Sequence, residues 1–555
     1  MAKKKRRNPF IPKGDPQSWF ARGEPLLWFN ASGVTLSLLL VGALLYLLTA
    51  NGLAHFWPKP LYSLSVAATG TDGSENESEP TKRLYVERVR TEVSTHATGE
   101  QRSTLFRRGN RDRGDGEFVW VNDENVVSLS RPAELVRVLR EAWGPAYGEL
   151  QSLETPRGTV ALSPDADQAL YEALDRIDAV RSKMAALENG TIRKLNREAQ
   201  RLYQRERAIG GDAPLAEELG KEQARLSAAF TGAQRDMLEM AQSIEPYWLT
   251  LRVDSGELWR LPLASVLAVQ HPNSMSYVEK LESWALQLWA FLSTAPRESN
   301  TEGGVFPAIV GTVVMVLLMS VIVAPFGVLA AIYLHEYAKQ DWKTRLIRIG
   351  VNNLAGVPSI VYGVFGLGFL VYVVGGELDK LFYSDALPSP TFGAPGLLWA
   401  SITLALLTLP VVIVATEEGL ARIPQSLRDG SLALGATRFE TLWRIIVPIA
   451  TPAMMTGVIL AIARAAGEVA PLMLVGVVKL APALPIDSHY PYLHLDQKFM
   501  HLGYHVFDVG FQSANIEAAR PLVYATALLL VVLTIGLNLF AVLLRNHLRE
   551  KYKAL

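Results

Sequence analysis

The sequence predicts an all-α membrane protein of six transmembrane helices, with a large α+β domain inserted between the first and second helices. Five runs contain no Asp, Glu, Lys or Arg, and each exceeds the about 20 apolar residues that a bilayer-spanning helix needs. The segment between the first two runs is polar and carries 30 of the 54 basic residues. The uncharged runs are Pro25–Pro58, Val305–Leu334, Ile349–Gly376, Ala386–Thr416 and Pro521–Leu544.

The composition narrows the class of protein further. Lys and Arg total 54 and Asp and Glu total 54, so the chain lacks the basic surplus of a nucleic-acid-binding protein. The apolar runs exclude a cytosolic enzyme. The absence of cysteine excludes disulfide bonds and thiol chemistry.

The first predicted span, 31–50, follows a tail (1–30) that has five consecutive basic residues at 3–7. A cleaved signal peptide is the alternative, but the thirty-residue lead-in and the long apolar stretch favour an uncleaved anchor. One more span, the fifth in chain order, carries two charges, Arg464 and Glu468, and brings the total to six. The spans after the first are expected at about 306–333, 351–374, 397–416, 451–478 and 521–544.

The distribution of Lys and Arg predicts the orientation of these spans. Six spans place both termini on one side, and the short segments of that side carry 19 Lys and Arg residues against 4 on the other. Both termini, including the tail 1–30, are therefore expected in the cytoplasm, and the segment 51–300 is expected outside.

The external segment 51–300 is expected to mix strands and helices. Alternating apolar residues at 84–86 and 118–121 predict strands after a polar linker, Thr69–Pro80. From Ser163 apolar residues recur every three or four positions, and Gly210-Gly211 interrupts them, which predicts an antiparallel helical hairpin.

Two further elements complete this domain before the second span. Asp254-Ser255-Gly256 is expected to join two strands in a tight hairpin, and Tyr277–Leu292 is expected to form an amphipathic helix that leads into the membrane. We find no catalytic constellation, no metal-ligand cluster and no nucleotide-binding motif in the chain. It is therefore expected to have no catalytic residues and no cofactor of its own.

Loop 417–448 contains the most informative pattern. Asp429-Gly430-Ser431 is followed after three residues by Gly435 and, after nine further residues, by Ile445, which leads to Pro448. Gly435 permits a sharp bend between two short helices, and apolar positions beside arginines suit docking into a partner's groove. An ordinary amphipathic loop lying on the membrane surface is the alternative.

This spacing resembles the coupling-loop signature of ABC importer permeases, which is Glu-Ala-Ala, three residues, Gly, nine residues and Ile-x-Leu-Pro. The chain departs from it in having Asp429-Gly430-Ser431 for Glu-Ala-Ala and Val447 for Leu. The resemblance implies that this loop contacts a cytoplasmic ATPase. The residues expected to couple to the ATPase are Asp429, Gly430, Leu434, Gly435, Ala436, Thr437, Ile445 and Pro448.

Other segments resemble one subfamily, the permeases of phosphate-specific ABC transporters. They are Glu302–Thr312, Gly356–Gly363, Thr456–Leu460 and Arg464–Pro471, and the Val-Ala-Pro-Leu that follows Glu468 is similar to the PstA type rather than the PstC type. The resemblance covers about 290–555. It does not cover the external segment, because such permeases have only a short connection between spans one and two.

The resemblance implies a type I ABC importer permease in the bacterial inner membrane, with the permease domain at 301–555 and a periplasmic domain at 51–300. It also implies four kinds of partner besides lipid: inorganic phosphate, a PstC-like second permease, a PstB-like ATPase dimer and a PstS-like periplasmic phosphate-binding protein. ATP and Mg would be bound by the partner ATPase.

The charged pair within the predicted fifth span provides the candidate substrate path. Arg464 is about 15 residues into that span, roughly 22 Å along a helix, and Glu468 is one turn further on the same face. A guanidinium suits phosphate oxygens, whereas a permanent ion pair that fixes helix packing is the alternative. Ser359 and Tyr362, in the span that contains Pro358, are further candidate donors to phosphate.

The predicted function is therefore the permease subunit of an ATP-driven phosphate importer. Two alternatives remain open. One is an ABC-type transmembrane signalling or scaffold protein, which does not need Arg464 and Glu468 inside the bundle. The other is a permease for a different oxyanion, because the residues themselves indicate only an anion.

Overall fold

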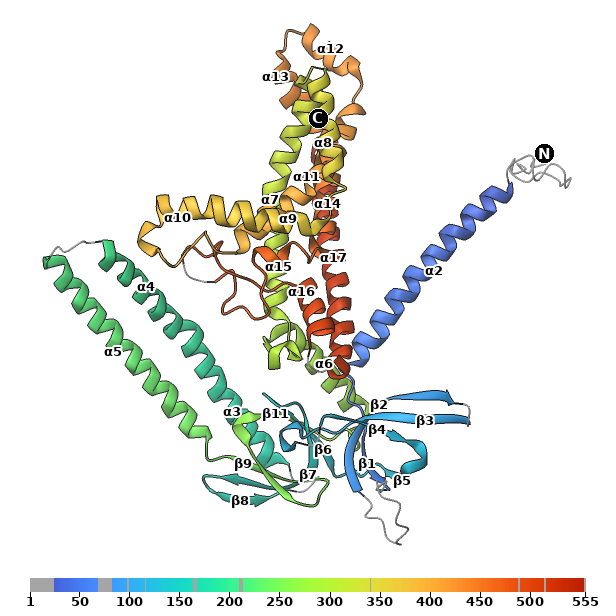
Figure 1. Ribbon diagram of the computed structural model, residues 1–555, viewed down its shortest axis with the longest axis vertical. Coiled ribbons are helices and arrows are strands. Elements are labelled where there is room, and N and C mark those ends of the chain that lie inside the picture. The colour runs from blue at the N-terminus through green and yellow to red at the C-terminus, as the bar shows by residue number, and fades with distance from the viewer. Residues whose placement is uncertain are drawn as a thin grey trace, which may run out of the picture.

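A computed structural model describes residues 24–553, apart from 68–81, 97–98, 115, 163–166, 209–212, 340, 488–489 and 514–515. Figure 1 shows an elongated molecule in which a bundle of long helices carries a domain of β-sheets at one end. The short helices α12 (Gln425–Ala433) and α13 (Arg438–Thr441) lie at the opposite end, near the C-terminus.

Six helices among the described residues are long and apolar enough to cross a membrane, which confirms the predicted number of spans. Three are continuous α-helices, and the other three contain π-helical segments that interrupt the regular hydrogen-bond ladder. The continuous spans are Leu26–Ala54 in α2 (Glu24–Ala54), Leu397–Ala421, which is α11, and Ile516–His547 in α17 (Ile516–Lys553). The span Phe306–Tyr337 consists of α7 (Phe306–Ile332) and η6 (Tyr333–Tyr337), and the span Ser359–Phe382 consists of α9 (Ser359–Phe365), η7 (Gly366–Gly375) and α10 (Gly376–Phe382). The span Arg438–Gly467 consists of α13, η9 (Leu442–Ile446) and α14 (Val447–Gly467).

The core of the bundle lies where α7, α11 and α14 pack together. Small residues allow this approach: a Cβ added to Gly457 would come within 2.9 Å of Ala415, and one added to Gly327 within 2.6 Å of Val412. In contrast, α2 diverges from the bundle in Figure 1 and meets α17 near its own end, at Gly52.

Two predicted spans are displaced in the structure. The helix expected at 351–374 occupies Ser359–Phe382, because Pro358 disfavours helical geometry in the residue before it and α8 (Trp342–Leu354) ends first. The span expected at 451–478 ends at Gly467. Its remaining apolar residues form a loop and the short helix α15 (Leu472–Val475), which packs against α9 and α11.

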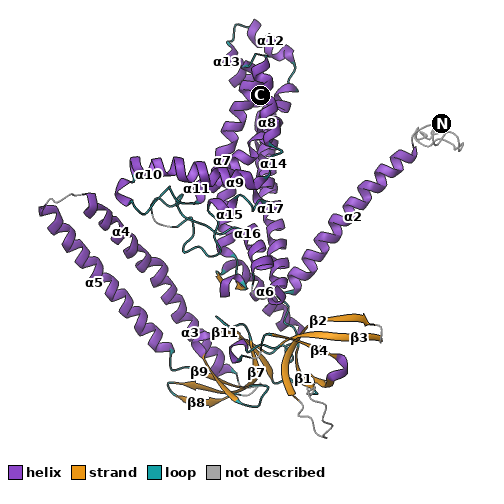
Figure 2. Ribbon diagram, in the orientation of Figure 1, coloured by secondary structure: helices purple, strands orange, loops and turns teal. Residues whose placement is uncertain are grey.

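The inserted domain (51–300) contains two antiparallel sheets, and Figure 2 shows that they form one end of the molecule. The first has the order β4-β3-β2-β1-β5 and the second the order β10-β9-β7-β6-β11, with β8 paired to β7. The strands are β1 (Leu61–Val66), β2 (Lys82–His96), β3 (Gly99–Arg107), β4 (Phe118–Asn122), β5 (Val126–Ser130), β6 (Leu135–Arg140), β7 (Ala146–Thr155), β8 (Gly158–Ala161), β9 (Trp248–Arg252), β10 (Leu258–Pro262) and β11 (Val266–Gln270).

The local predictions for this domain are confirmed where the structure describes them. Strands contain 84–86 and 118–121, and β9 and β10 form the hairpin around Gly256, whose φ of 82° suits glycine. The expected linker Thr69–Pro80 and the pair Gly210-Gly211 lie outside the described residues.

The predicted helical hairpin is also present. It consists of α3 (Gln168–Ala186), the π-helical turn Leu187–Ile192, α4 (Arg193–Ala208) and α5 (Ala213–Ile244), and it extends beside the bundle in Figure 1. Its α4 helix contacts the loop that follows α15, where Arg197 Nη1 lies 2.6 Å from Asp487 Oδ2. An ion pair therefore joins the helical hairpin to the permease region.

The helix α6 (Tyr277–Ser293) connects the inserted domain to the bundle, as predicted. A capping box of Ser276 and Glu279 begins it, and Trp284 Nε1 donates to the Leu53 carbonyl at the end of α2. A short strap, 296–303, containing β12 (Pro296–Arg297), a 3-10 turn (Glu298–Asn300) and β13 (Glu302–Gly303), then leads into α7. The helices α16 (Leu502–Phe507) and η10 (Asp508–Gln512) pack on α17.

Candidate substrate path and coupling surface

Arg464 and Glu468 form the predicted ion pair, but at the end of a helix rather than in its middle. Arg464 lies in the last turn of α14, and Glu468 caps that helix with extended backbone angles. Arg464 Nε is 3.5 Å from Glu468 Oε1, and the side chains are 34% and 23% exposed. A pair joined at this distance and open on one side can exchange partners.

Tyr362 is close to this pair, and Ser359 begins the same helix. A Cβ added to Gly363 would lie 2.7 Å from Pro471 Cα, so α9 packs directly on the segment that follows Glu468. The Tyr362 hydroxyl donates to the Leu354 carbonyl at 2.8 Å, which occupies its proton and orients its oxygen. Ser359 is half-buried at the first position of α9.

The structure also contains a buried carboxylate that sequence reasoning missed. Asp379, in α10, is 1% exposed and accepts hydrogen bonds from the backbone N–H groups of Thr391, Phe392 and Gly393, at 2.7 to 2.9 Å. These donors satisfy the carboxylate within the chain. Its role is to hold the loop before α11, because the Phe392 carbonyl in turn accepts from Trp399 Nε1.

Six of the eight predicted coupling residues lie on α12 or around one bend at the end of the molecule, and the other two, Ile445 and Pro448, lie in the helix that follows. Gly435 has a φ of 88°, which places the bend between α12 and α13, and Thr437 caps α13 in a capping box with Glu440. A contact of 2.8 Å between the Ser431 and Thr441 hydroxyls joins the two helices. Asp429 and Gly430 lie on α12, Leu434 and Ala436 flank Gly435, Ile445 lies in η9 and Pro448 at the start of α14.

This tip presents apolar side chains to solvent. Leu434 is 91% exposed, and Phe439 and Trp443 are also exposed. Arg428 anchors the tip to the bundle, since its guanidinium contacts Glu336 Oε1 at 2.8 Å and the Ile423 carbonyl at 2.8 Å. A rigid base with an uncovered apolar end is the form expected of a docking surface.

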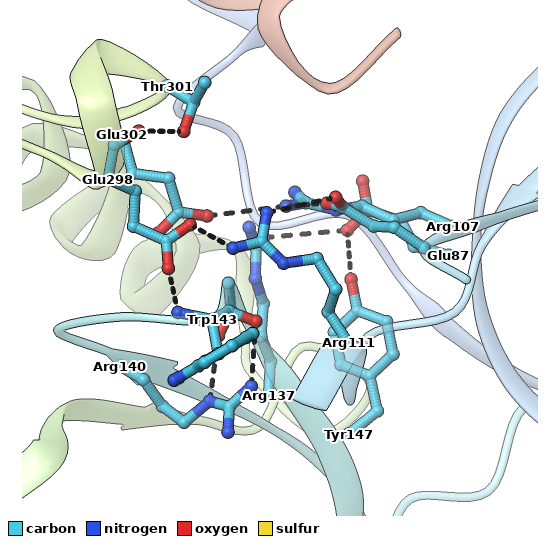
Figure 3. A network of polar contacts seen from close by, with 12 residues as sticks. Glu87, Arg107, Arg111, Arg137, Arg140, Trp143, Tyr147, Glu298, Thr301 and Glu302 are labelled. Carbon is cyan, nitrogen blue, oxygen red and sulfur yellow. Dashed lines mark hydrogen bonds and ion pairs between the residues drawn. The ribbon is translucent and has the colours of Figure 1, made fainter. Parts of the chain in front are cut away.

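A second group of charges, not foreseen from the sequence, lies where the inserted domain meets the strap (Figure 3). Arg107 Nη2 is 2.6 Å from Glu117 Oε1 and 3.5 Å from Glu302 Oε1. Arg111 Nη2 is 2.8 Å from Glu298 Oε2, which also accepts the backbone N–H of Trp143 through its other oxygen. These contacts connect β3 and the turn after it to the residues immediately before α7.

Glu87 forms the centre of the same group. It is buried, with Lys59 Nζ 3.2 Å and Arg137 Nη1 3.7 Å away, and Tyr147 donates to it at 3.3 Å. Burial opposes ionisation of Glu87, but the charges of Arg137, Lys59 and Arg107 outweigh it and hold the pKa of this carboxyl below its ordinary value. Burial raises the pKa of Tyr147, which keeps its phenol neutral.

Neither this group nor the pair in the bundle has the form of a metal centre. The described residues contain no group of three or more His, Cys, Asp or Glu side chains arranged to hold a metal ion. The chemistry available at both places is ion pairing and hydrogen bonding to an anion.

Comparison with known proteins identifies the family. Residues 323–553 match the family described as binding-protein-dependent transport system inner membrane component. The phosphate transport system permease protein PstA of Mycobacterium leprae is 32% identical over 287 residues, which are 51% of this chain and 83% of the relative. The chain belongs to the PstA-type ABC permeases. A PstA-type permease is a multi-pass membrane transport subunit and not an enzyme.

Other proteins are similar to parts of this chain. PstA 1 of Mycobacterium tuberculosis H37Rv is 34% identical over 44% of this chain and 70% of the relative. The probable ABC transporter permease protein YqgH of Bacillus subtilis is 35% identical, but this chain spans only 64% of its length. The inward-facing MetNI methionine transporter has 18% identity, covers 49% of this chain and 99% of its own, and has a TM-score of 0.31.

Proposed function

We propose that this PstA-type permease is a transmembrane subunit of an ATP-driven phosphate importer. The observation that carries the proposal is its 32% identity to a phosphate permease over 83% of that relative. The substrate path would run past Arg464 in the last turn of α14, beside the segment that follows this helix and packs on α9. Phosphate bound there would compete with Glu468 for the guanidinium, and Ser359 and Tyr362 would line the same path.

The proposed partners follow from the family. They are a PstC-like second permease, a PstB-like ATPase dimer that binds ATP and Mg, and a PstS-like phosphate-binding protein. The exposed tip formed by α12 and α13 would dock on the ATPase, with both chain termini on the same side. The inserted domain would then face the periplasm, because it lies at the other end of the bundle.

The proposed mechanism is alternating access. Closure of the ATPase dimer would move α12 and α13, and the anchor between Arg428 and Glu336 would pass that movement to α7. The path around Arg464 would open to the outside in one state and to the inside in the other. The coupling is a free-energy difference between two arrangements of the bundle, and no chemical step takes place in this chain.

The test is uptake of radiolabelled phosphate into vesicles that contain this chain with the second permease, the ATPase and the binding protein. We expect uptake that requires ATP and persists in excess sulfate. Uptake that sulfate abolishes would indicate a permease for a broader set of oxyanions. A complex that assembles and hydrolyses ATP without any uptake would favour the signalling or scaffold alternative.

A further inference from the structure

A cavity of about 180 Å³ lies at the junction between the inserted domain and the ends of α2, α6 and α17. This junction cavity has room for several waters, or for a five-atom anion and its first waters. Four arginines line it, from both sheets and from the strap before α7: Arg107, Arg111, Arg137 and Arg297. It is separate from the proposed path, since neither Arg464 nor any residue of α9 lines it.

Two of these four arginines are incompletely satisfied within the chain. The Nε atoms of Arg137 and Arg297 are buried without a hydrogen-bond partner. Arg137 Nη1 approaches Glu87 no closer than 3.7 Å, beyond hydrogen-bond distance. A buried donor without a partner is costly, and a guanidinium presents its donors as a rigid fork that matches tetrahedral oxyanions. Arg107 and Arg111, in contrast, are paired at 2.6 and 2.8 Å.

The charge balance of the lining is positive. Three glutamates, Glu117, Glu298 and Glu302, face the four arginines, and His55 adds no charge because burial lowers its pKa to about 3. Glu87 does not line the cavity; it lies 3.7 Å from Arg137 and 3.2 Å from Lys59, and together Glu87 and Lys59 leave this balance unchanged. Burial also lowers the pKa of Arg297, although nearby carboxylates act in the opposite direction. The negative charge of these carboxylates therefore does not offset the cost of burying the Arg297 guanidinium.

We propose that the junction cavity is a binding site for a tetrahedral oxyanion, held by the guanidinium groups of Arg137 and Arg297. This second site lies outside the transmembrane path. The inference rests on the proposed function only for the choice of inorganic phosphate as the ligand to test. The bound anion supplies the acceptors that Arg137 and Arg297 lack, and it lies against the strap that leads into α7.

Glu302 opposes this anion. Its carboxylate lines the cavity 3.5 Å from Arg107, and burial raises its pKa, with Arg107 acting in the opposite direction. A negative charge at this position repels an incoming oxyanion and competes for Arg107. Removing that charge with Glu302→Gln therefore strengthens binding, an effect that damage to the fold does not produce.

The experiment measures equilibrium binding of radiolabelled inorganic phosphate to the full chain in lipid nanodiscs. All variants carry Arg464→Gln, so that the proposed path does not contribute. We expect one saturable site that sulfate displaces and chloride at equal concentration does not. Adding Arg137→Gln and Arg297→Gln weakens binding at least tenfold, and adding Glu302→Gln strengthens it severalfold. Arg260→Gln, which removes an exposed arginine of the same domain, is the matched control.

Three results would overturn the site. The first is that the folded Arg464→Gln chain shows no saturable binding of phosphate. The second is that replacing Arg137 and Arg297 leaves binding unchanged, and the third is that Glu302→Gln does not strengthen it. Circular dichroism establishes that each variant is folded. This assay measures phosphate binding to an isolated chain, whereas ATP-dependent uptake tests the proposed function. A negative result in one assay can therefore be told apart from a negative result in the other.

Discussion

The bundle and the junction each contain arginine–glutamate contacts, and the two kinds differ in how firmly they are held. Arg464 and Glu468 meet at 3.5 Å, with side chains 34% and 23% exposed. Arg107 contacts Glu117 through two nitrogens, at 2.6 and 2.8 Å, and these side chains are 17% and 5% exposed. Arg107 is also 3.5 Å from Glu302 on another segment.

This difference suggests different roles for the same residue types. A buried pair with two short contacts is disrupted at high cost, because breaking it leaves an uncompensated charge in a poorly solvated place. A single longer contact at a helix end gives way more easily, so its arginine is available to an anion. We therefore interpret the junction pairs around Arg107 as structural, and the bundle pair as part of the transport path.

Arg464→Ala tests the first half of this comparison and has the largest expected effect. It removes the guanidinium proposed to meet phosphate, so we expect uptake to fall at least a hundredfold while the four-component complex still assembles. Phosphate uptake into vesicles and co-purification of the partners measure the two effects. Arg260→Ala is the control, and wild-type uptake by Arg464→Ala would show that the pair only fixes helix packing.

Arg107→Ala tests the second half. It removes both short contacts that the buried Glu117 makes with Arg107 and leaves Arg111 Nη1 as a more distant partner, at 3.9 Å, so we expect the free energy of unfolding of the inserted domain to fall by about 3–5 kcal/mol. Denaturant titration followed by tryptophan fluorescence measures this quantity. Arg260→Ala breaks an exposed pair with Glu154 and should cost at most about 1 kcal/mol. Equal losses from the two variants would contradict the distinction between buried and exposed pairs.

Gly435→Val tests whether the tip acts through its shape. A β-branched residue is strained by about 1–3 kcal/mol at a φ of 88°, so the bend between α12 and α13 should change. We expect more ATP to be hydrolysed for each phosphate transported. Gly256→Val places the same strain, at a φ of 82°, in the turn between β9 and β10 and should leave that ratio unchanged. An unaltered ratio in Gly435→Val would argue against docking at the bend.

The pH dependence of the junction is expected to change the free energy of unfolding least for each step of the experiment, which is one pH unit. Burial lowers the pKa of His55 from 6.5 to about 3, so the unfolded chain binds a proton between these values that the folded chain does not. The free energy of unfolding should therefore be highest above pH 6.5 and decline as the pH falls towards 3, by on the order of 1 kcal/mol per pH unit. Denaturant titrations at several pH values should give a flatter profile for His55→Gln. An unchanged profile would assign the pH dependence to other groups.

The sequence determined the features that depend on nearby residues. Long apolar runs, five of them uncharged and one carrying Arg464 and Glu468, establish the six spans because a bilayer core accepts little else. The turn at Asp254-Ser255-Gly256 and the bend at Gly435 follow from local backbone preferences. Gly435 could be placed at a bend for the same reason, whereas Thr437 is assigned to the coupling surface only by the family resemblance, and its capping box with Glu440 is a finding of the structure.

Tertiary structure decided the features that depend on distant residues. Hydropathy extends through 478, but α14 ends at Gly467 because the following residues pack as α15 against α9 and α11. The junction pairs join residues far apart in the chain, 195 positions for Arg107 and Glu302 and 187 for Arg111 and Glu298. No local pattern selects such partners, because their electrostatic energy arises only when folding brings them together in a site shielded from water.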